Sequence, residues 1–235
     1  MFKIKHYKSI KSTNKKASEF CRKGIYNIVV VADEQREGVG RYGRSWYSPK
    51  GGLYFSILLK PKIEISSISS LPLVCGVGVA NGLKKFGFPV KLKWPNDLIL
   101  NGKKVGGILC KLEIQKECFV IMGVGINVNI EKFPSTLPSA TSLFIDSGKK
   151  INTSTLLNEL LDNIKRTYDK FERNKDKILN DWRKFSDTLG RKVKILSSSG
   201  EFSGKAVDID ENGYLLVRDD DGYIEKVIEG DCIYY

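Results

Sequence analysis

The stretch from Gly38 to Gly52, which reads GVGRYGRSWYSPKGG, restricts the possible folds of this chain more than any other segment. It begins with the pattern G-x-G-x-x-G, which in dinucleotide-binding folds closes a turn and opens a helix whose N-terminus holds a pyrophosphate. No helix can follow here, because Pro49, Gly51 and Gly52 stand where that helix would run. The segment is therefore a glycine-rich loop between two strands, and the interpretation as a nicotinamide enzyme fails.

The composition is that of a globular chain with an excess of basic residues. With 235 residues, 41% of them hydrophobic, the chain can bury a substantial core. Its formal charge of +12 favours anionic partners such as nucleic acid or phosphorylated ligands, although the lysines are spread along the chain as on a solvated surface. The longest apolar stretch, Leu71–Leu83, is too short to cross a membrane, and the N-terminus lacks signal-peptide features, so we expect a cytoplasmic protein.

The histidine and cysteine content excludes several kinds of chemistry. His6 is the only histidine, which argues against Ser-His-Asp and Cys-His catalysis and against the kinase H-R-D loop. The five cysteines form no C-x-x-C pair, so they are predicted to be reduced packing residues rather than a zinc site or a disulfide framework. Any chemistry must therefore run without a histidine base.

The pattern of apolar residues predicts an α+β fold with a central sheet and flanking helices. The expected helices are 12–24, 69–86, 152–174 and 175–185, and the expected strands are 25–32, 53–59, 90–94, 97–100, 104–114 and 118–128. Beyond Gly190 the sequence alternates apolar and polar residues between turns, as in a small antiparallel barrel. We place a domain boundary near Leu189.

Three side chains of the glycine-rich loop suggest a lid over an anionic ligand. Arg41 and Arg44 are close enough in sequence to reach one phosphate, and Trp46 offers a flat face for a base or ring. Glycines on either side let backbone N–H groups approach a ligand. An adenylate has the required chemistry, whereas the alternative is a surface loop whose tryptophan packs inward.

The segment KWPNDLILNGKKVGGIL predicts a second part of the site. A hairpin turning at Asn101-Gly102 would bring Asp97 close to Lys104, and Asn96 could bond an adenine or ribose edge. Paired glycines at Gly106 and Gly107 suggest that a ligand lies against the strand. The alternative is an ordinary surface ion pair on a hairpin.

A third segment, VIMGVGINVNI, adds a weaker signal of the same kind. Gly123 and Gly125 inside a strand suggest close approach of something flat, and Asn127 could project a hydrogen-bonding group into the same space.

Taken together, these segments resemble the biotin protein ligases, which attach biotin to a lysine of biotin carrier domains. The matching pieces are STN at 12–14, Gln35, the loop at 38–52, residues 93–109, GVGINVN at 123–129 and SATSL at 139–143. They occur in the family's order, and the resemblance extends over nearly the whole chain. One departure is Val39, which stands where the family's loop usually has its first arginine.

The resemblance implies a class II synthetase-like catalytic domain over 1–189 and an SH3-like barrel over 190–235. It implies two substrates, ATP with Mg²⁺ and biotin, and a biotinyl-adenylate intermediate. The implied catalytic residues are Lys104, Arg41, Arg44 and Asp97. The implied biotin-binding residues are Ser12, Thr13, Asn14, Gln35, Gly38, Val39, Gly40, Arg41, Lys104, Gly106 and Gly107. The implied adenylate-binding residues are Arg41, Arg44, Trp46, Asn96, Lys104 and Asn127, and the Mg²⁺ ligands are not identified.

The implied partner is a biotin carboxyl carrier protein. Because only eleven residues precede Ser12, we expect no DNA-binding module. An exposed edge of the sheet could pair two subunits as a homodimer or dock the acceptor. Two other functions remain open: a lipoate or octanoate ligase of similar architecture, and a basic nucleic-acid-binding protein, against which the C-terminal segment contains more acidic than basic residues.

Overall fold

The computed structural model describes residues 2–198 and 200–235, and the chain divides into two compact units. One unit contains Met1–Lys62 and Leu100–Glu159, and the other contains Ile63–Ile99 and Leu160–Tyr235.

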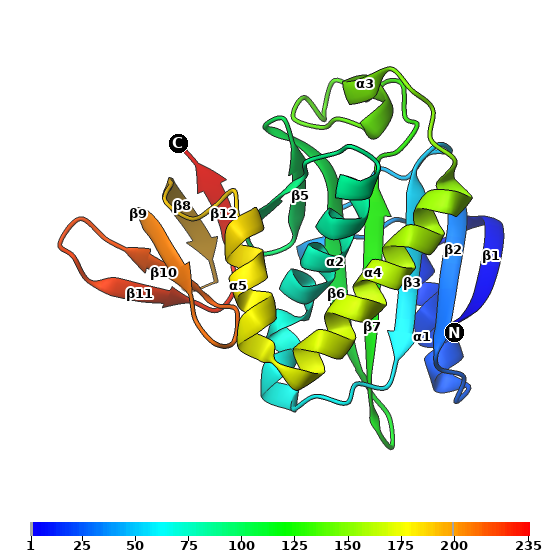
Figure 1. The fold of residues 1–235 in the computed structure, drawn as a ribbon, viewed down its shortest axis with the longest axis horizontal. Helices are drawn as coiled ribbons and strands as arrows, with labels where there is room; N and C mark the ends of the chain where they lie inside the picture. The colour runs from blue at the N-terminus through cyan, green and yellow to red at the C-terminus, as the bar shows by residue number, and fades with distance from the viewer. Residues whose placement is uncertain (1, 199) are drawn as a thin grey trace. The chain divides into compact units, whose positions relative to one another are not determined.

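The first unit is built on a mixed sheet with the strand order β1-β2-β3-β7-β6 (Figure 1). Its strands are β1 (Lys3–Ile10), β2 (Ile28–Gln35), β3 (Leu53–Leu59), β6 (Lys103–Ile114) and β7 (Cys118–Ile126). β1 runs parallel to β2, and the other neighbours are antiparallel. This confirms the predicted mixed sheet. β3 is buried along its whole length, as its apolar sequence predicts.

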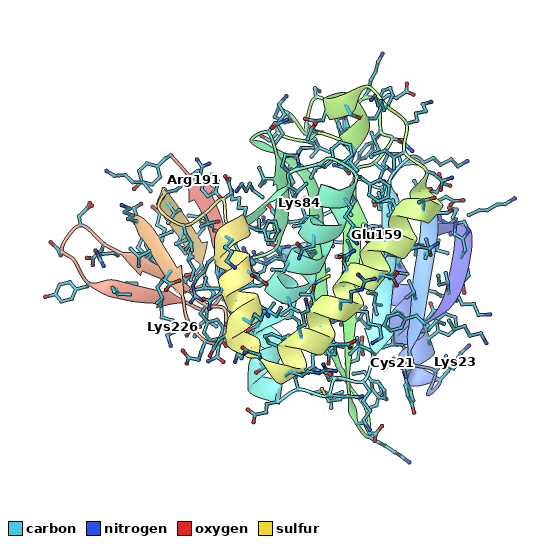
Figure 2. The ribbon with its side chains drawn as sticks, in the orientation of Figure 1. Cys21, Lys23, Lys84, Glu159, Arg191 and Lys226 are labelled. Carbon is cyan, nitrogen blue, oxygen red and sulfur yellow. The ribbon has the colours of Figure 1, made fainter. Side chains whose placement is uncertain are left out.

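Helix α1 (Thr13–Arg22) packs on this sheet through its small apolar face. Ala17 and Cys21 lie one turn apart and share a buried cluster with Val30, Leu58 and Ile121 of the strands; Cys21 is labelled in Figure 2. The helix ends before Gly24, whose φ of 70° is the left-handed conformation that glycine adopts most easily.

The second unit contains a short 3₁₀ turn and the larger helices. These elements are η2 (Ile65–Ser70), α2 (Leu71–Lys85), most of α4 (Thr153–Arg173) and α5 (Lys175–Phe185). Gly78 of α2 faces helix α4. A Cβ there would lie 2.7 Å from Cα of Ile164, so a larger residue would push α2 and α4 apart. No helix in residues 2–198 and 200–235 is both long and apolar enough to span a membrane.

The strands of the second unit form a hairpin and an antiparallel sheet. The hairpin is β4 (Lys91–Lys93) with β5 (Asp97–Leu100), and the sheet has the order β11-β10-β9-β8-β12. Its strands are β8 (Lys192–Ser197), β9 (Gly200–Ile209), β10 (Leu215–Arg218), β11 (Ile224–Val227) and β12 (Asp231–Tyr234). The predicted antiparallel sheet is confirmed. Among the described residues its two end strands, β11 and β12, do not pair with each other, so closure into a barrel is not confirmed. The boundary near Leu189 stays a prediction, because this compact unit also includes α2 and α5.

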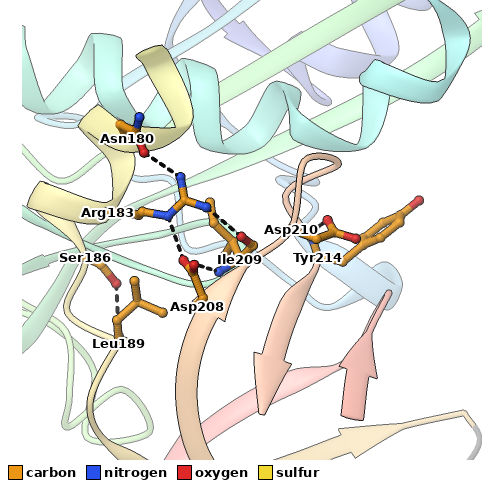
Figure 3. A network of polar contacts seen from close by, with 8 residues as sticks. All are labelled: Asn180, Arg183, Ser186, Leu189, Asp208, Ile209, Asp210 and Tyr214. Carbon is orange, nitrogen blue, oxygen red and sulfur yellow. Dashed lines mark hydrogen bonds and ion pairs between the residues drawn. The ribbon is translucent and has the colours of Figure 1, made fainter. Parts of the chain in front are cut away.

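Two polar clusters lie at the end of β9, in the C-terminal sheet (Figure 3). Arg183 of α5 donates from Nε to Asp208 over 2.6 Å and from Nη2 to the Ile209 carbonyl over 2.7 Å. Asp210 accepts the backbone N–H groups of Asn212 and Tyr214 over 2.8 and 3.0 Å. These bonds tie β9 to α5 and close the turn between β9 and β10.

Asp210 also forms an ion pair with Lys226, which is labelled in Figure 2; Nζ and Oδ2 are 2.8 Å apart. Burial alone would raise the pKa of this carboxyl. The ammonium of Lys226 and the two backbone N–H groups outweigh that effect and hold the pKa below its usual range.

Several local details differ from the sequence prediction, and β1 was not among the expected strands. β2 begins at Ile28 rather than Ile25, because Asn27 adopts a left-handed φ of 57° and turns the chain. The helix expected over 69–86 is divided into η2 and α2. A short helix that was not predicted, α3 (Leu143–Ser147), begins at Ser142, whose hydroxyl accepts the Ile145 N–H over 3.0 Å.

Candidate active site

The glycine-rich loop is anchored at both ends by hydrogen bonds. Directly after β2, the N–H groups of Arg36 and Glu37 donate to the carbonyls of Ile10 and Lys11 over 2.9 and 2.8 Å. At the other end, the Tyr54 hydroxyl donates to the Pro49 carbonyl over 2.9 Å. Burial raises the pKa of Tyr54, so its phenol remains a donor. These bonds fix where the loop leaves β2 and where it enters β3.

The loop tip is a small hairpin. Val39 pairs with Ser45, and the N–H of Gly40 donates to the Arg44 carbonyl over 2.8 Å. Gly38 is buried where a Cβ would lie 2.5 Å from both Ser48 Oγ and the Trp46 carbonyl. Gly38 is thus required for closure of the loop itself.

Tyr42 brings the two loop arginines together at the tip. Its ring centroid lies 4.8 Å from Cζ of Arg41 and 5.4 Å from Cζ of Arg44, and its hydroxyl accepts from Arg41 Nη2 over 2.8 Å. Tyr42 has a left-handed φ of 54° and is 57% exposed. A large aromatic residue held this way at an exposed tip groups two guanidinium charges where an anion can meet both.

The start of α1 carries a buried polar cluster. The N–H and Oγ1 of Thr13 donate to Gln35 Oε1 over 2.8 and 3.1 Å, and Ser56 of β3 donates to Thr13 Oγ1 over 2.7 Å. Ser12, the N-cap residue, is also buried. The predicted biotin-binding residues Ser12, Thr13 and Gln35 thus lie together, and the two bonds from Thr13 fix the orientation of the glutamine amide.

Asn14 is held by the sheet. Its Oδ1 and Thr13 Oγ1 share the single hydrogen of the Ser56 hydroxyl, and its Nδ2 donates to the Leu109 carbonyl over 3.4 Å. Gly123 leaves the space for this amide, because a Cβ there would overlap Asn14 Oδ1. The polar groups of Asn14 therefore dock α1 onto the strands, and its assignment to biotin binding stays a prediction.

Trp46 lies between Lys104 and the backbone of β7. Lys104 Nζ is 5.3 Å from the centroid of the indole ring, and a Cβ at Gly125 would lie 2.5 Å from Trp46 Nε1. The flat group that approaches Gly125 is thus a side chain of the protein itself. Trp46 Nε1 is buried without a hydrogen-bond partner among the described residues.

Lys104 stands near the start of β6 beside the SATSL segment. Its N–H donates to the Ser139 carbonyl over 2.8 Å, and its carbonyl accepts from Thr141 over 2.9 Å. Gly106 and Gly107 follow on the same strand, opposite Ile126 and Gly125 of β7. The two bonds to the SATSL segment hold the backbone of Lys104, so only its long side chain has to adjust to a ligand.

Asn127 has a structural partner. It is 3% exposed, and its Nδ2 donates to the Thr141 carbonyl over 2.9 Å. This bond positions the SATSL segment that borders Lys104. Direct contact of Asn127 with an adenylate stays a prediction.

Asn96 and Asp97 lie in the second unit, at the turn between β4 and β5. Asp97 is opposite Lys93 in the hairpin. The preceding Trp94 is buried, and its Nε1 donates to the Gly213 carbonyl over 3.0 Å. Lys104 belongs to the first unit, so the expected proximity of Asp97 and Lys104 stays a prediction.

Sequence reasoning missed three residues of this site: Tyr42, Ser48 and Ser56. Ser56 left a signal, because its small hydroxyl side chain stands inside the buried strand LYFSILL, and a buried hydroxyl requires a partner. Nothing in the sequence near Tyr42 or Ser48 indicated their contacts. No group of three or more His, Cys, Asp or Glu side chains suited to a metal ion occurs in the described part of the chain.

Comparison with known proteins assigns this site to a family. The profile of the Biotin/lipoate A/B protein ligase family matches residues 7–127, and that of the biotin protein ligase C-terminal domain matches residues 188–235. The chain belongs to the biotin/lipoate A/B protein ligase family.

Within this family the chain is similar to biotin protein ligases. The biotin protein ligase from Aquifex aeolicus, solved in complex with biotin and ATP, superposes with a TM-score of 0.88 and 34% identity, covering 99% of this chain and 98% of that one. The bifunctional ligase/repressor BirA of Bacillus spizizenii is 35% identical over 231 residues, which are 94% of this chain and 71% of BirA. The biotin–[acetyl-CoA-carboxylase] ligase of Paracoccus denitrificans is 29% identical over 224 residues, 88% of this chain and 90% of that protein.

Proposed function

We propose that this protein activates biotin with ATP as biotinyl-5′-adenylate and transfers the biotinyl group to a lysine of a biotin carrier protein. The observation that carries the proposal is the proximity of Lys104, on β6, to Trp46. The loop that contains Trp46 also groups Arg41 and Arg44 around Tyr42. Cationic groups and an aromatic face are the chemistry that an adenylate requires. The similarity to biotin protein ligases over nearly the whole chain supports it.

In the first step, the biotin carboxylate attacks the α-phosphorus of ATP. A new oxygen–phosphorus bond forms, the bond to the leaving oxygen breaks, and pyrophosphate departs. Negative charge accumulates on the phosphate oxygens, and Lys104, Arg41 and Arg44 stabilise it electrostatically. Thr13 and Gln35 hold the ureido head of biotin, so that the carboxylate stays in line for attack.

In the second step, the acceptor lysine amine attacks the acyl carbon of the adenylate. The amide bond forms, the bond between the acyl carbon and the AMP oxygen breaks, and the amine loses its proton to solvent. The protein supplies no covalent nucleophile, in agreement with a chain whose only histidine, His6, is bonded to Asp33 over 2.6 Å on an exposed strand. Trp46 stacks on the adenine and keeps the adenylate in place until the acceptor arrives.

The acceptor we propose is a biotin carboxyl carrier protein or domain, since relatives are named biotin–[acetyl-CoA-carboxylase] ligases. ATP enters as its magnesium complex. The described residues offer no cluster of metal ligands, so we assign no protein ligand to Mg²⁺ and derive no step through it.

The test is ATP–pyrophosphate exchange measured with biotin, lipoate and octanoate in turn. Of the three acids, only biotin is expected to support exchange. A carrier domain that is then added should become biotinylated. Exchange that depends on lipoate or octanoate instead would refute the proposal in favour of the other branch of the family. Salt-sensitive DNA or RNA binding that biotin does not affect would favour the nucleic-acid alternative.

A further inference from the structure

A chain of hydrogen bonds continues from the start of α1 into the loop. Gln35 Nε2 donates to Ser48 Oγ over 3.0 Å, and Ser48 Oγ donates to the Trp46 carbonyl over 2.9 Å. With the bonds from Thr13 to Gln35, the chain reaches from a residue proposed to hold biotin to the residue proposed to hold adenine.

The direction of every bond in this chain is determined. The Ser48 hydroxyl has one hydrogen, which goes to the Trp46 carbonyl, so its oxygen accepts from Gln35. The amide oxygen of Gln35 therefore faces Thr13. Nε2 carries two hydrogens and gives one to Ser48, so the other can serve the ureido carbonyl of biotin. Bonds arranged head to tail strengthen one another.

The surroundings make Ser48 hard to replace. Its side chain is 5% exposed, so bulk water cannot take the place of its hydroxyl. Gly38 brings its backbone against both Ser48 Oγ and the Trp46 carbonyl, and its own carbonyl accepts the Trp46 N–H over 2.9 Å. The main chain of Trp46 is thus fixed at its N–H by Gly38 and at its carbonyl by Ser48.

We propose that Ser48 is a positioning residue that couples biotin binding to nucleotide binding; this inference rests on the proposed function. Biotin bonded to the second Nε2 hydrogen of Gln35 adds one more restraint to an amide already held by Thr13 and Ser48, and Ser48 passes that added restraint to the backbone of Trp46. A nucleotide that then stacks on the indole loses less conformational freedom than it would without biotin. The same coupling must act in reverse, because linkage between two binding equilibria is reciprocal.

The experiment is calorimetric titration of a non-hydrolysable ATP analogue with and without saturating biotin. The ratio of the two dissociation constants is the coupling factor, measured for wild type, Ser48→Ala, Ser48→Thr and the control Ser45→Ala, whose serine is exposed at the loop tip. Ser48→Ala is expected to lower the coupling factor by about tenfold, the size of one lost hydrogen bond. Ser48→Thr keeps the hydroxyl and should restore coupling, and Ser45→Ala should behave as wild type.

Coupling in Ser48→Ala equal to that of wild type would overturn the inference, as would a wild type in which biotin does not alter the affinity for the nucleotide. Ser48→Cys, which keeps the size but is a weak donor, gives the same test if the alanine variant does not fold. A wild type that binds no biotin at all would instead contradict the proposed function. A purely structural role of Ser48 would change thermal stability and leave the coupling factor intact.

Discussion

Two glycines of β7 allow a matched test of how the sheet supports the site. Gly123 and Gly125 lie two residues apart on one face of the strand, and each leaves room for a different side chain. A Cβ at Gly125 would lie 2.5 Å from Trp46 Nε1, whereas one at Gly123 would overlap the Asn14 amide. We predict that alanine at the two positions produces two distinct defects.

In Gly125→Ala, an ordinary carbon contact of about 3.5 Å requires the indole of Trp46 to shift by roughly 1 Å. The indole has no hydrogen bond to lose among the described residues, so its side chain can shift while its main chain stays in place, and the free energy of unfolding should change by less than about 1 kcal/mol. Base stacking on an aromatic residue contributes about 1 to 3 kcal/mol. The KM for ATP should therefore rise by roughly 5- to 150-fold, while the affinity for biotin is retained.

In Gly123→Ala, the obstacle is a bonded amide. Asn14 bonds Ser56 and the Leu109 carbonyl, and the Ser56 side chain is fully buried. Displacing the amide leaves buried polar groups without partners, so the free energy of unfolding should fall by about 1 to 3 kcal/mol.

Urea unfolding and ATP–pyrophosphate exchange at saturating biotin measure both effects. An unchanged KM for ATP in Gly125→Ala, or an equal loss of stability in the two variants, would show that these glycines do not make separate room for Trp46 and Asn14.

Three further predictions concern single charges. Lys104→Ala should slow single-turnover formation of biotinyl-adenylate by about 2 to 4 kcal/mol of transition-state stabilisation with little loss of fold stability, and an unaltered rate would remove this lysine from the mechanism. Arg41→Gly removes a charge-assisted contact to the adenylate and the bond to Tyr42. Reactive adenylate should therefore escape from the site and label lysines of a bystander protein. Adenylate formation without increased labelling would contradict the role of the loop. Asp210→Asn should lower the free energy of unfolding by about 1 kcal/mol at pH 7. The folded pKa of Asp210 is depressed, so the stabilisation by its charge is present above the unfolded pKa of about 3.9 and is lost as pH falls through the folded pKa. The free energies of unfolding of wild type and variant should therefore converge in acid. A difference between them that persists in acid would exclude a role of the charge.

The sequence by itself determined most of the elements and the family of this protein. Apolar periodicity placed the helices and the buried strands within a few residues, because alternation and the helical repeat are local consequences of which face is buried. Gly24, Pro49 and Gly52 marked ends and loops, because their backbone preferences do not depend on distant neighbours. The order of the motifs was sufficient to indicate a biotin protein ligase.

Only the tertiary structure decided which side chains meet. The flat group against Gly125 is Trp46, and the amide of Asn127 supports the SATSL segment through Thr141. Ser56 meets Thr13 across 43 positions of sequence. A buried hydroxyl or amide must find a hydrogen-bond partner, but its own sequence neighbourhood does not specify which one. That choice depends on strand register and on the packing of α1 against the sheet, and both exist only once the chain has folded.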